Sequence, residues 1–189
     1  MKACRSGKKS RRPKTAKGRS VTGRAWVLGD NINTDLILAG KYCRMADPAE
    51  LGRHAFEGVI AGFAGKVRKG DIIVAGRNFG CGSSREQAPL ALLAAGVSAI
   101  VASSFGRIFF RNAINLGLTV MKCPGARASV RPYDRVSVDA GRGTFHNGRD
   151  GRMAAGERLP EFLLDILDAG GLVPYMGKRL RRRREGRDG

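Results

Sequence analysis

The stretch D-I-I-V-A-G-R-N-F-G-C-G-S-S-R-E-Q-A-P, from Asp71 to Pro89, decides the fold of this chain of 189 residues. It begins with a β-branched apolar run that ends at Ala75 and follows a Lys-Gly turn, a pattern typical of a buried strand. It ends in an apolar helical pattern that begins near Arg85. A strand, a short loop and a helix in this order indicate an α/β domain built on a parallel sheet.

The loop between this strand and helix has the composition of an anion site. Three glycines are followed by two serines and an arginine: Gly76, Gly80, Gly82, Ser83, Ser84 and Arg85. Glycine lets backbone amides approach a ligand closely, and the beginning of a helix favours negative charge. A guanidinium group adds a planar fork that suits a carboxylate. The loop therefore predicts a site for a small carboxylate or phosphate.

A purely structural interpretation of the same loop stands beside this one. Ser83 with Glu86, and Ser84 with Gln87, each match the spacing of a capping box, which stabilises a helix without any ligand. Pro89 blurs the predicted beginning of the helix, because a proline inside a helix forfeits a backbone hydrogen bond. The local pattern alone leaves both interpretations open.

The rest of the chain extends the α/β pattern and then changes to a β pattern. We expect strands at Arg24–Leu28, Val97–Ala102 and Leu118–Lys122, and helices at Asp47–Phe56, Arg107–Leu116 and Pro160–Leu167. We expect a hairpin whose two arms are Arg135–Val138 and Thr144–Asn147. A glycine pair at Gly170–Gly171 is expected to end the last of these helices. Gly58 to Gly70 is glycine-rich and is expected to be irregular.

The formal charge of +19 lies mostly at the two ends of the chain. Residues 1–24 hold ten Lys and Arg and no acid, and residues 177–189 hold seven Lys and Arg and two acids. Runs of like charge are typically disordered. We therefore expect a basic extension over 1–22, one domain over 23–176 and a basic tail over 177–189. Such tails can contact phosphates, so an RNA-binding protein is the alternative of another class, although no aromatic residue is interleaved to stack on bases.

The spacing of the cysteines limits the metal sites that the chain can form. The four cysteines are far apart in the sequence: Cys4, Cys43, Cys81 and Cys123. None forms a C-x-x-C pair, so we expect no metal site and no cofactor on this chain alone. No apolar stretch is long enough to cross a membrane, and no signal peptide is visible. Together these features lead us to expect a cytoplasmic protein.

Three motifs carry a resemblance to a known family. They are G-D-N-I-N-T-D-L-I-L-A-G-K-Y (29–42), G-R-N-F-G-C-G-S-S-R-E-Q-A-P-L-A-L (76–92) and S-S-F-G-R-I-F-F-R-N-A-I-N-L-G-L (103–118). In this order and spacing they resemble the small subunits of 3-isopropylmalate dehydratase and homoaconitase, and the swivelling domain of aconitase. The resemblance covers roughly Gly23 to Tyr175. One departure is Gln87, where the family usually has histidine.

The resemblance implies a fold and a partner. The fold would be the aconitase-type swivelling β/β/α domain, with a mostly parallel central sheet and flanking helices. The partner would be a larger subunit that carries a four-iron, four-sulfur cluster, in a heterodimer or heterotetramer. This chain would then be inactive alone, as the small subunit of a hydro-lyase that isomerises 2- and 3-isopropylmalate in leucine biosynthesis.

The resemblance also assigns roles to residues. Ser83 would be the base that removes a proton next to a substrate carboxylate, and Asp35 would be the acidic residue near it. Substrate carboxylate would be held by side chains and loop amides at Ser84, Arg85, Gly80 and Gly82. Local preferences alone favour the interpretation of Asp35 as an ordinary turn or cap aspartate.

Arg44 bears on the substrate. In this family the residues after Tyr42 form a loop that recognises the variable arm of the substrate. An arginine there suits a second carboxylate, as in homoaconitate, whereas an isopropyl arm favours an apolar surface. Arg44 can also simply face water, as arginines usually do. The choice of substrate therefore stays open at this point, as does any movement of residues 58–70 over the site.

Overall fold

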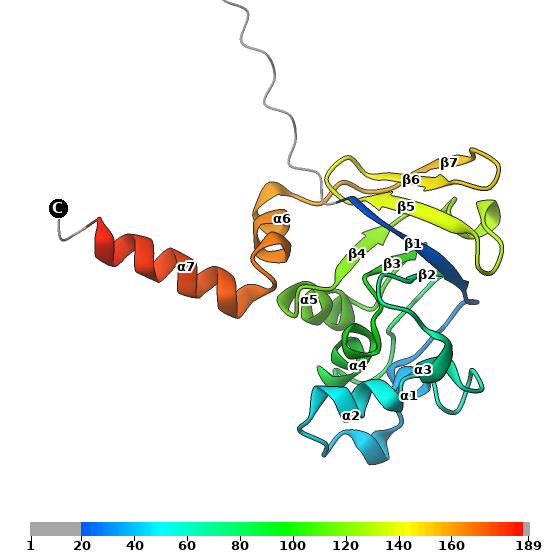
Figure 1. Cartoon of the computed structure of the whole chain (residues 1–189), viewed down its shortest axis with the longest axis horizontal. Helices are drawn as coiled ribbons and strands as arrows, with labels where there is room; N and C mark the ends of the chain where they lie inside the picture. Colours follow the sequence, from blue (N-terminus) through cyan, green and yellow to red (C-terminus); the bar gives the residue numbers. More distant parts are fainter. Residues whose placement is uncertain (1–19, 187–189) are drawn as a thin grey trace, which may run out of the picture.

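The structure is a computed structural model that describes residues 20–186, with the side chain of Arg182 excepted. Most of the predicted basic extension, residues 1–22, therefore lies outside the described residues. The core is a curled sheet of seven strands in the order β4-β3-β2-β1-β5-β6-β7 (Figure 1). The strands are β1 (Ser20–Val27), β2 (Ile72–Ala75), β3 (Ala99–Ala102), β4 (Thr119–Lys122), β5 (Arg135–Asp139), β6 (Thr144–Asn147) and β7 (Met153–Ala155).

Strands β1 to β4 form the parallel half of the sheet that the sequence predicted. Ile73 of β2 lies beside Trp26 of β1 and Ile100 of β3, and β4 continues the same direction. All four residues of both β2 and β3 are buried, as expected of strands that are covered on two faces.

The second half of the sheet is antiparallel. Strand β5 pairs with β1, and β5, β6 and β7 form a meander. Val136, Val138 and Phe145 are buried and pack with Ile72 and Val74 on one face of the parallel half. The hairpin predicted for residues 135–147 is thus confirmed, and it covers one face of the sheet with apolar side chains.

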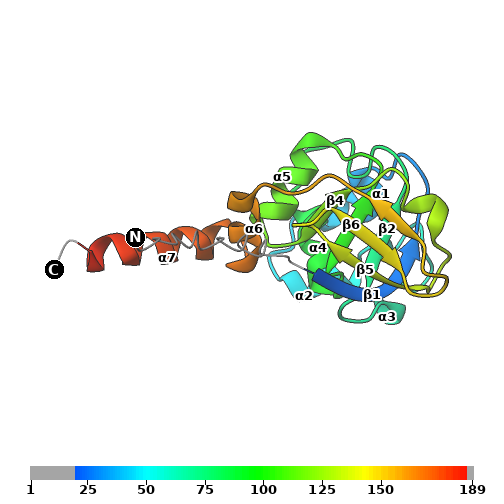
Figure 2. The ribbon, with the colours of Figure 1, turned by 90° about the horizontal axis from the view of Figure 1, so that it is seen from above.

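Helices cover the other face of the sheet (Figures 1 and 2). They are α1 (Thr34–Ile37), α2 (Pro48–Arg53), α3 (Phe63–Lys66), α4 (Gln87–Ala95), α5 (Arg107–Asn115), α6 (Glu161–Asp168) and α7 (Leu172–Glu185), with short 3-10 turns at Gly40–Tyr42 and Arg127–Ser129. Ile73, Ile100 and Val120 pack against this layer, together with Leu92 of α4 and Phe109 of α5. The α/β fold class predicted from the sequence is therefore confirmed, with a mixed sheet in which three strand pairs are parallel and three are antiparallel.

Four local predictions differ from the structure. Strand β1 begins at Ser20, where its first residue pairs with Asp139, and not at Arg24. The predicted irregular stretch between Gly58 and Gly70 includes the short helix α3. Strand β7 was not predicted. Residues 177–185 of the predicted basic tail belong to helix α7, which begins directly after the left-handed pair Gly170–Gly171.

Within residues 20–186, no helix combines the length and the apolar composition that a membrane crossing requires.

Candidate functional site

The three sequence motifs meet at the ends of the parallel strands, where backbone hydrogen bonds join their loops. The amide of Gly80 donates to the carbonyl of Ile32 (2.6 Å), and the amide of Thr34 donates to the carbonyl of Cys81 (2.9 Å). The amide of Phe79 donates to the carbonyl of Ser104 (3.0 Å). The loop of the central motif is therefore held between the loops of the other two motifs.

Polar side chains reinforce the same junction. The carboxylate of Asp30 accepts hydrogen bonds from the backbone amide of Arg77 (2.7 Å) and from its guanidinium (3.1 and 3.2 Å). The hydrogen bond from this amide, followed by those from the guanidinium, lowers the pKa of Asp30. The side chain of Asn78 donates to Asn31 (3.0 Å). Asp30 therefore stays charged at neutral pH and keeps the two loops together.

Two glycines of the central loop are required by the geometry. Gly80 has φ +72°, and a Cβ atom there would lie 2.2 Å from the ring of Phe109. Gly82 has φ +90°, a backbone conformation that L side chains rarely adopt. Gly106 lies against the backbone of Gly80, because a Cβ atom at Gly106 would lie only 2.4 Å from the carbonyl oxygen of Gly80. The glycines thus let three backbone segments come together tightly under the serines.

The serines lie at the exposed end of this loop. Ser83 and Ser84 are both exposed. The amides of Gly82, Ser83 and Ser84 donate to no backbone acceptor among the described residues. Successive free amides in a turn favour anions. The loop therefore offers two hydroxyl groups and three free N–H groups to a ligand.

The predicted capping boxes do not form. Helix α4 begins at Gln87, its N-cap is Glu86, and no side chain caps it. Pro89 is the third residue of α4, where a missing N–H loses no hydrogen bond. Ser83 is instead tied to the first motif, because its carbonyl accepts from the hydroxyl of Thr34 (3.1 Å). The serines are therefore free of a capping role.

Arg85 and Asp35 come together beside the serines, from segments fifty positions apart. Nη1 of Arg85 donates to Oδ1 of Asp35 (2.5 Å) and to the carbonyl of Leu38 (3.4 Å). The guanidinium also covers Gly40, where a Cβ atom would lie 3.5 Å from Nη2. The side chain of Arg85 is 23% exposed and that of Asp35 54%. Asp35 thus holds a half-buried guanidinium at the rim of the loop.

The segment from Gly40 to Arg44 lies next to Arg85. Nε2 of Gln87 donates to the carbonyl of Cys43 (3.3 Å), so Gln87 supports this segment from α4. Arg44 is exposed. The structure therefore brings Asp35, Arg85 and the serine loop together and leaves Arg44 at the surface.

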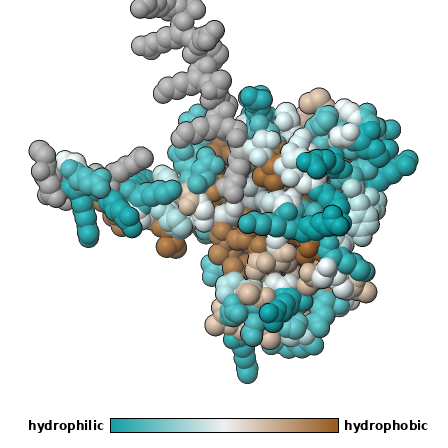
Figure 3. All heavy atoms as spheres, in the orientation of Figure 1, coloured by the Kyte–Doolittle hydropathy of each residue, from teal (hydrophilic) through white to brown (hydrophobic). Residues whose placement is uncertain are grey.

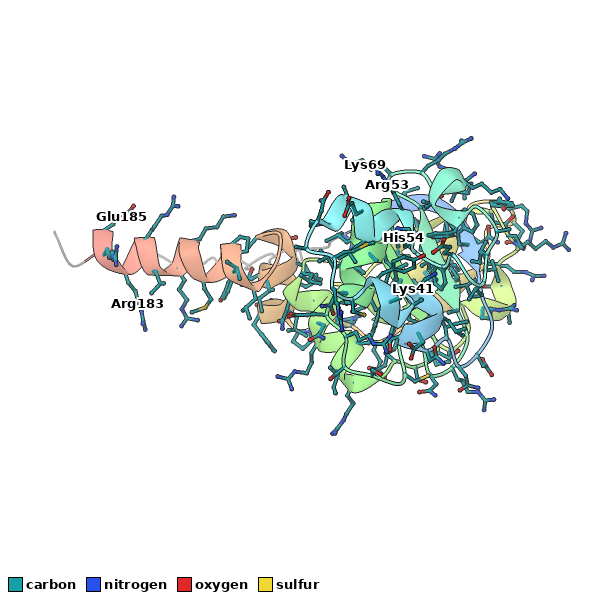
Figure 4. The ribbon with its side chains drawn as sticks, turned by 90° about the horizontal axis from the view of Figure 1, so that it is seen from below. Lys41, Arg53, His54, Lys69, Arg183 and Glu185 are labelled. Carbon is teal, nitrogen blue, oxygen red and sulfur yellow. The ribbon has the colours of Figure 1, made fainter. Side chains whose placement is uncertain are left out.

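An aromatic and charged cluster fixes the same segment from the other side. The rings of Tyr42 and His54 stack with centroids 3.8 Å apart, and Nδ1 of His54 lies 3.1 Å from Glu57. Lys41 lies over the ring of Tyr42 (4.7 Å). Hydrogen bonding by Tyr42 first, and then by His54, lowers the pKa of Glu57. Figure 4 shows Lys41 and His54 close together on one side of the body. His54 is thus a packing residue.

A shallow hollow of about 360 Å³ adjoins Asp35. Its lining is Asp35, Leu36, Ala39, Lys41, His54, Glu57, Gly58 and Val59. Leu36 and Val59 are exposed apolar residues, at 38% and 43%. The face that bears the serine loop is therefore open and partly apolar.

The described residues do not provide ligands for a metal centre. Within residues 20–186, no three His, Cys, Asp or Glu side chains gather closely enough to hold a metal ion. Cys43 and Cys81 are half-buried and Cys123 is buried, each as a free thiol, and burial raises the pKa of Cys123. The donor set of this part of the chain does not fit an iron–sulfur cluster.

Sequence reasoning missed Thr34 as a part of the site. Thr34 is 1% exposed, and both its amide and its hydroxyl donate to the serine loop. The signal that was available is its position directly before Asp35 in the first motif. No local pattern reveals its partner, because Ser83 lies 49 positions away.

Comparison with known proteins agrees with this geometry. The model of the aconitase C-terminal domain family matches residues 31–125. A 3-isopropylmalate dehydratase small subunit of Moorella thermoacetica is 47% identical over 161 residues, which are 85% of this chain and 97% of that protein. An isopropylmalate/citramalate isomerase small subunit of Methanocaldococcus jannaschii is 46% identical, over 85% of this chain and 95% of its own length.

A solved structure has the same fold. It is the crystal structure of a 3-isopropylmalate dehydratase of Methanocaldococcus jannaschii, with a TM-score of 0.81 and 40% identity. It covers 90% of this chain, and the match includes 99% of that chain.

Proposed function

Because this chain belongs to the aconitase C-terminal domain family, among the 3-isopropylmalate dehydratase small subunits, we propose that it is the small subunit of a hydro-lyase of that type. Its reaction would remove water from a substituted malate and add it back at the neighbouring carbon. One observation carries the proposal most directly. The Arg85–Asp35 pair stands at 2.5 Å beside two exposed serines and three free amides, as a carboxylate site requires.

In this proposal Ser83 takes the proton from the carbon next to a substrate carboxylate. A neutral serine hydroxyl is a very weak base, so the group that accepts this proton is the Ser83 alkoxide, which becomes the hydroxyl and needs preorganised donors around it beforehand. The free amides of Gly82 and Ser84 support that role. Thr34 fixes the carbonyl of Ser83 at 3.1 Å, which limits the positions that the side chain of Ser83 can take.

Arg85 and Ser84 hold the substrate carboxylate in this proposal. The guanidinium has further N–H groups beyond the one that Asp35 accepts, so it can pair with a carboxylate without leaving Asp35. Asp35 thereby orients Arg85, while amides at Gly80 and Gly82 shape the turn. Positioning of this kind lowers the entropic part of the barrier.

The departing hydroxyl group needs an electrophile that this part of the chain does not supply. We assign this role to a four-iron, four-sulfur cluster on a larger partner subunit, because the described residues lack its ligands. That subunit would cover the face that carries Ser83, Ser84 and the apolar hollow beside Asp35. The chain alone would then be inactive.

Two substrate classes remain in the proposal. The matched relatives are named as small subunits of a 3-isopropylmalate dehydratase and of an isopropylmalate/citramalate isomerase. These names favour a substrate that is a malate with a small apolar arm. A tricarboxylate of the homoaconitate type is the alternative, and Arg44 is the residue that favours it. Because Arg44 is exposed, its charge can be solvated without a second carboxylate, and we place isopropylmalate first.

The test is anaerobic co-expression with the large subunit, followed by hydration and dehydration assays with isopropylmalate, citramalate and homoaconitate. We expect no turnover from this chain alone and turnover from the complex. Ser83→Ala should lower kcat by roughly 10²- to 10⁴-fold, the usual contribution of a general base, without changing assembly. Ser137→Ala, on β5, is the matched control and should keep full activity.

Two results would oppose the proposal. Turnover by the chain without a partner would remove the need for a second subunit. Full activity of Ser83→Ala in an assembled complex would remove Ser83 from the reaction. A preference for homoaconitate, lost in Arg44→Ala, would instead select the tricarboxylate alternative.

A further inference from the structure

Helix α7 is attached to the body by its first turn alone in the views of Figures 1 and 2, and then projects away from it. Leu172 and Tyr175 pack against the main apolar core. The preceding pair Gly170–Gly171, with φ +88° and +119°, reverses the chain after α6. The direction of α7 is therefore set by packed residues, while its later turns are surrounded by solvent.

The projecting part of α7 is strongly cationic. Its described cations are all exposed: Lys178, Arg179, Arg181, Arg183 and Arg184. None of them forms an ion pair or a side-chain hydrogen bond with another described residue. Figure 4 shows Arg183 extending sideways from the part of α7 that projects from the body. These five cations lie within seven consecutive residues of one helix, whereas arginines of the body that have no described partner, such as Arg53 and Arg135, lie on separate elements.

The spacing of these cations adds mutual repulsion. Lys178 and Arg181 are three positions apart, as are Arg181 and Arg184, and like charges at this spacing destabilise a helix. Only Glu185, at the last position of α7, provides an opposite charge in this part of the helix. A polyanion bound along the helix would relieve this repulsion.

The surface of α7 favours a nucleic acid over a membrane. An exposed apolar row runs along Val173, Met176 and Leu180, but Arg183 continues the same row three positions later. A helix that lies in a membrane interface needs a continuous apolar face, whereas a phosphate backbone needs only cations. Figure 3 shows hydrophilic surface over the outer part of α7 and hydrophobic surface near its base.

We propose that α7 binds the phosphate backbone of nucleic acid without sequence preference. The binding is electrostatic and follows from counterion release, so it weakens steeply with salt. Arginine suits this role because its planar fork pairs with phosphate oxygens. The role is separate from the proposed hydro-lyase activity and does not depend on it.

The test uses the full-length chain and a fluorescent 20-base-pair DNA duplex, with anisotropy measured between 50 and 200 mM NaCl. The variant Arg181→Gln/Arg183→Gln/Arg184→Gln should bind at least about tenfold more weakly at the lowest salt. It should also reduce the slope of log K against log salt by about 2 to 3, at close to 0.9 for each lost phosphate contact. The basic residues 1–19 remain in every variant, so they contribute equally throughout.

The matched control is Arg53→Gln/Arg131→Gln/Arg135→Gln. It removes the same charge from exposed arginines of the body, whose side chains have no described partner. We expect nearly unchanged binding from it. The charge-preserving variant Arg181→Lys/Arg183→Lys/Arg184→Lys should also bind, and circular dichroism checks that each variant keeps its helix.

Three results would overturn the proposal. One is equal weakening by the α7 variant and by the body control, which would indicate net charge alone. Another is the absence of binding at 50 mM salt. The third is stronger binding to phosphatidylserine vesicles than to the duplex, which would assign α7 to a membrane surface. None of these measurements depends on hydro-lyase turnover.

Discussion

At the scale of single residues, the hydroxyl of Thr34 controls the position of the serine loop. Thr34 is buried, and it donates from its amide to Cys81 and from its hydroxyl to Ser83. Gly82 lies between Cys81 and Ser83 in the chain, and a Cβ atom at Gly82 would lie 3.5 Å from the hydroxyl oxygen of Thr34. Thr34 is thus a positioning residue that acts on the proposed base through its backbone.

Replacing Thr34 tests this role. Thr34→Val keeps the shape but removes the hydroxyl donor, so we expect kcat of the assembled enzyme to fall by roughly tenfold, because small misplacements of a reacting group are costly. KM should change little, since the Arg85–Asp35 pair is untouched. Steady-state kinetics of the complex is the measurement.

Thr34→Ser is the rescue control, because it restores the hydroxyl with a smaller side chain. We expect most of the lost kcat to return. Equal losses in the valine and serine variants would indicate that the methyl group and its packing matter and the hydrogen bond does not.

Site residues were predictable where the motif itself carries the chemistry. Ser83, Ser84, Arg85 and Asp35 were all named from the sequence, and the structure places Arg85 against Asp35. The contacts that link the motifs were not predictable, because they join residues about fifty positions apart. The roles of these residues in a reaction stay predictions.

At the scale of elements, the capping boxes show why a local signal was wrong. Both serine pairs have the required spacing, yet α4 begins two residues later than expected, at Gln87. The backbone of Ser83 is instead bonded to Thr34 and to the amide of Arg85 (2.9 Å). A long-range contact therefore outweighed a local preference.

The basic segment after residue 176 forms a helix, and not the expected disordered tail, for a related reason. Its composition indicates disorder, but apolar residues directly before it, Leu172 and Tyr175, pack against the body. They anchor the first turn of α7, and helix growth from an existing turn needs far less ordering than nucleation. Strands β2, β3, β4 and β5, in contrast, were predictable because each is an unbroken or alternating apolar run, whereas β7 is only three residues long and carries no such pattern.

The crossing of α2 and α4 depends on one glycine. Gly52 is buried, and a Cβ atom there would lie 2.9 Å from the amide nitrogen of Ala95. Gly52→Ala should therefore force the helices apart and destabilise the fold by about 1 to 3 kcal/mol, as overpacking does. Urea unfolding followed by circular dichroism measures the change.

Gly58→Ala is the matched control for Gly52→Ala. No atom lies within 4 Å of a Cβ atom at Gly58, and its φ is not in the left-handed region. We expect it to leave the free energy of unfolding unchanged or slightly raised, because alanine restricts the unfolded chain. Destabilisation of similar size in both variants would show that helix crossing is not the cause.

At the scale of the whole molecule, two buried carboxylates join the parts of the sheet. Asp71 accepts from Arg24 (2.8 Å), from Trp26 (2.7 Å) and from the amide of Arg68 (3.0 Å). Asp134 accepts from Asn147 (2.8 Å) among its partners, which ties the turn before β5 to the end of β6. The first network connects β1, β2 and the segment after α3.

Burial alone would raise the pKa of both carboxyls, but their donors outweigh it. For Asp71, the donors are Arg24, the amide of Arg68 and Trp26, and the net pKa is lowered. For Asp134, the amide of Arg131 and then Arg149 and Asn147 have the same effect. A carboxyl whose pKa is lower in the folded than in the unfolded state stabilises the fold above the unfolded value, near pH 4, and loses that contribution as the pH falls through the folded value.

Asp71→Asn should therefore change stability in a pH-dependent way. At pH 7 we expect a loss of about 2 to 4 kcal/mol, because Arg24 keeps its charge while its buried partner loses its own. As the pH falls below about 4 and through the lowered pKa of Asp71, the wild-type protein protonates Asp71 and loses the same contribution, so the difference between the two proteins should shrink. Urea unfolding at a series of pH values measures it, with Asp168→Asn on the exposed side of α6 as a control that should differ little at any pH. A difference that stays constant from pH 7 to pH 2 would mean that the packing of residue 71, and not its charge, holds β1 to β2.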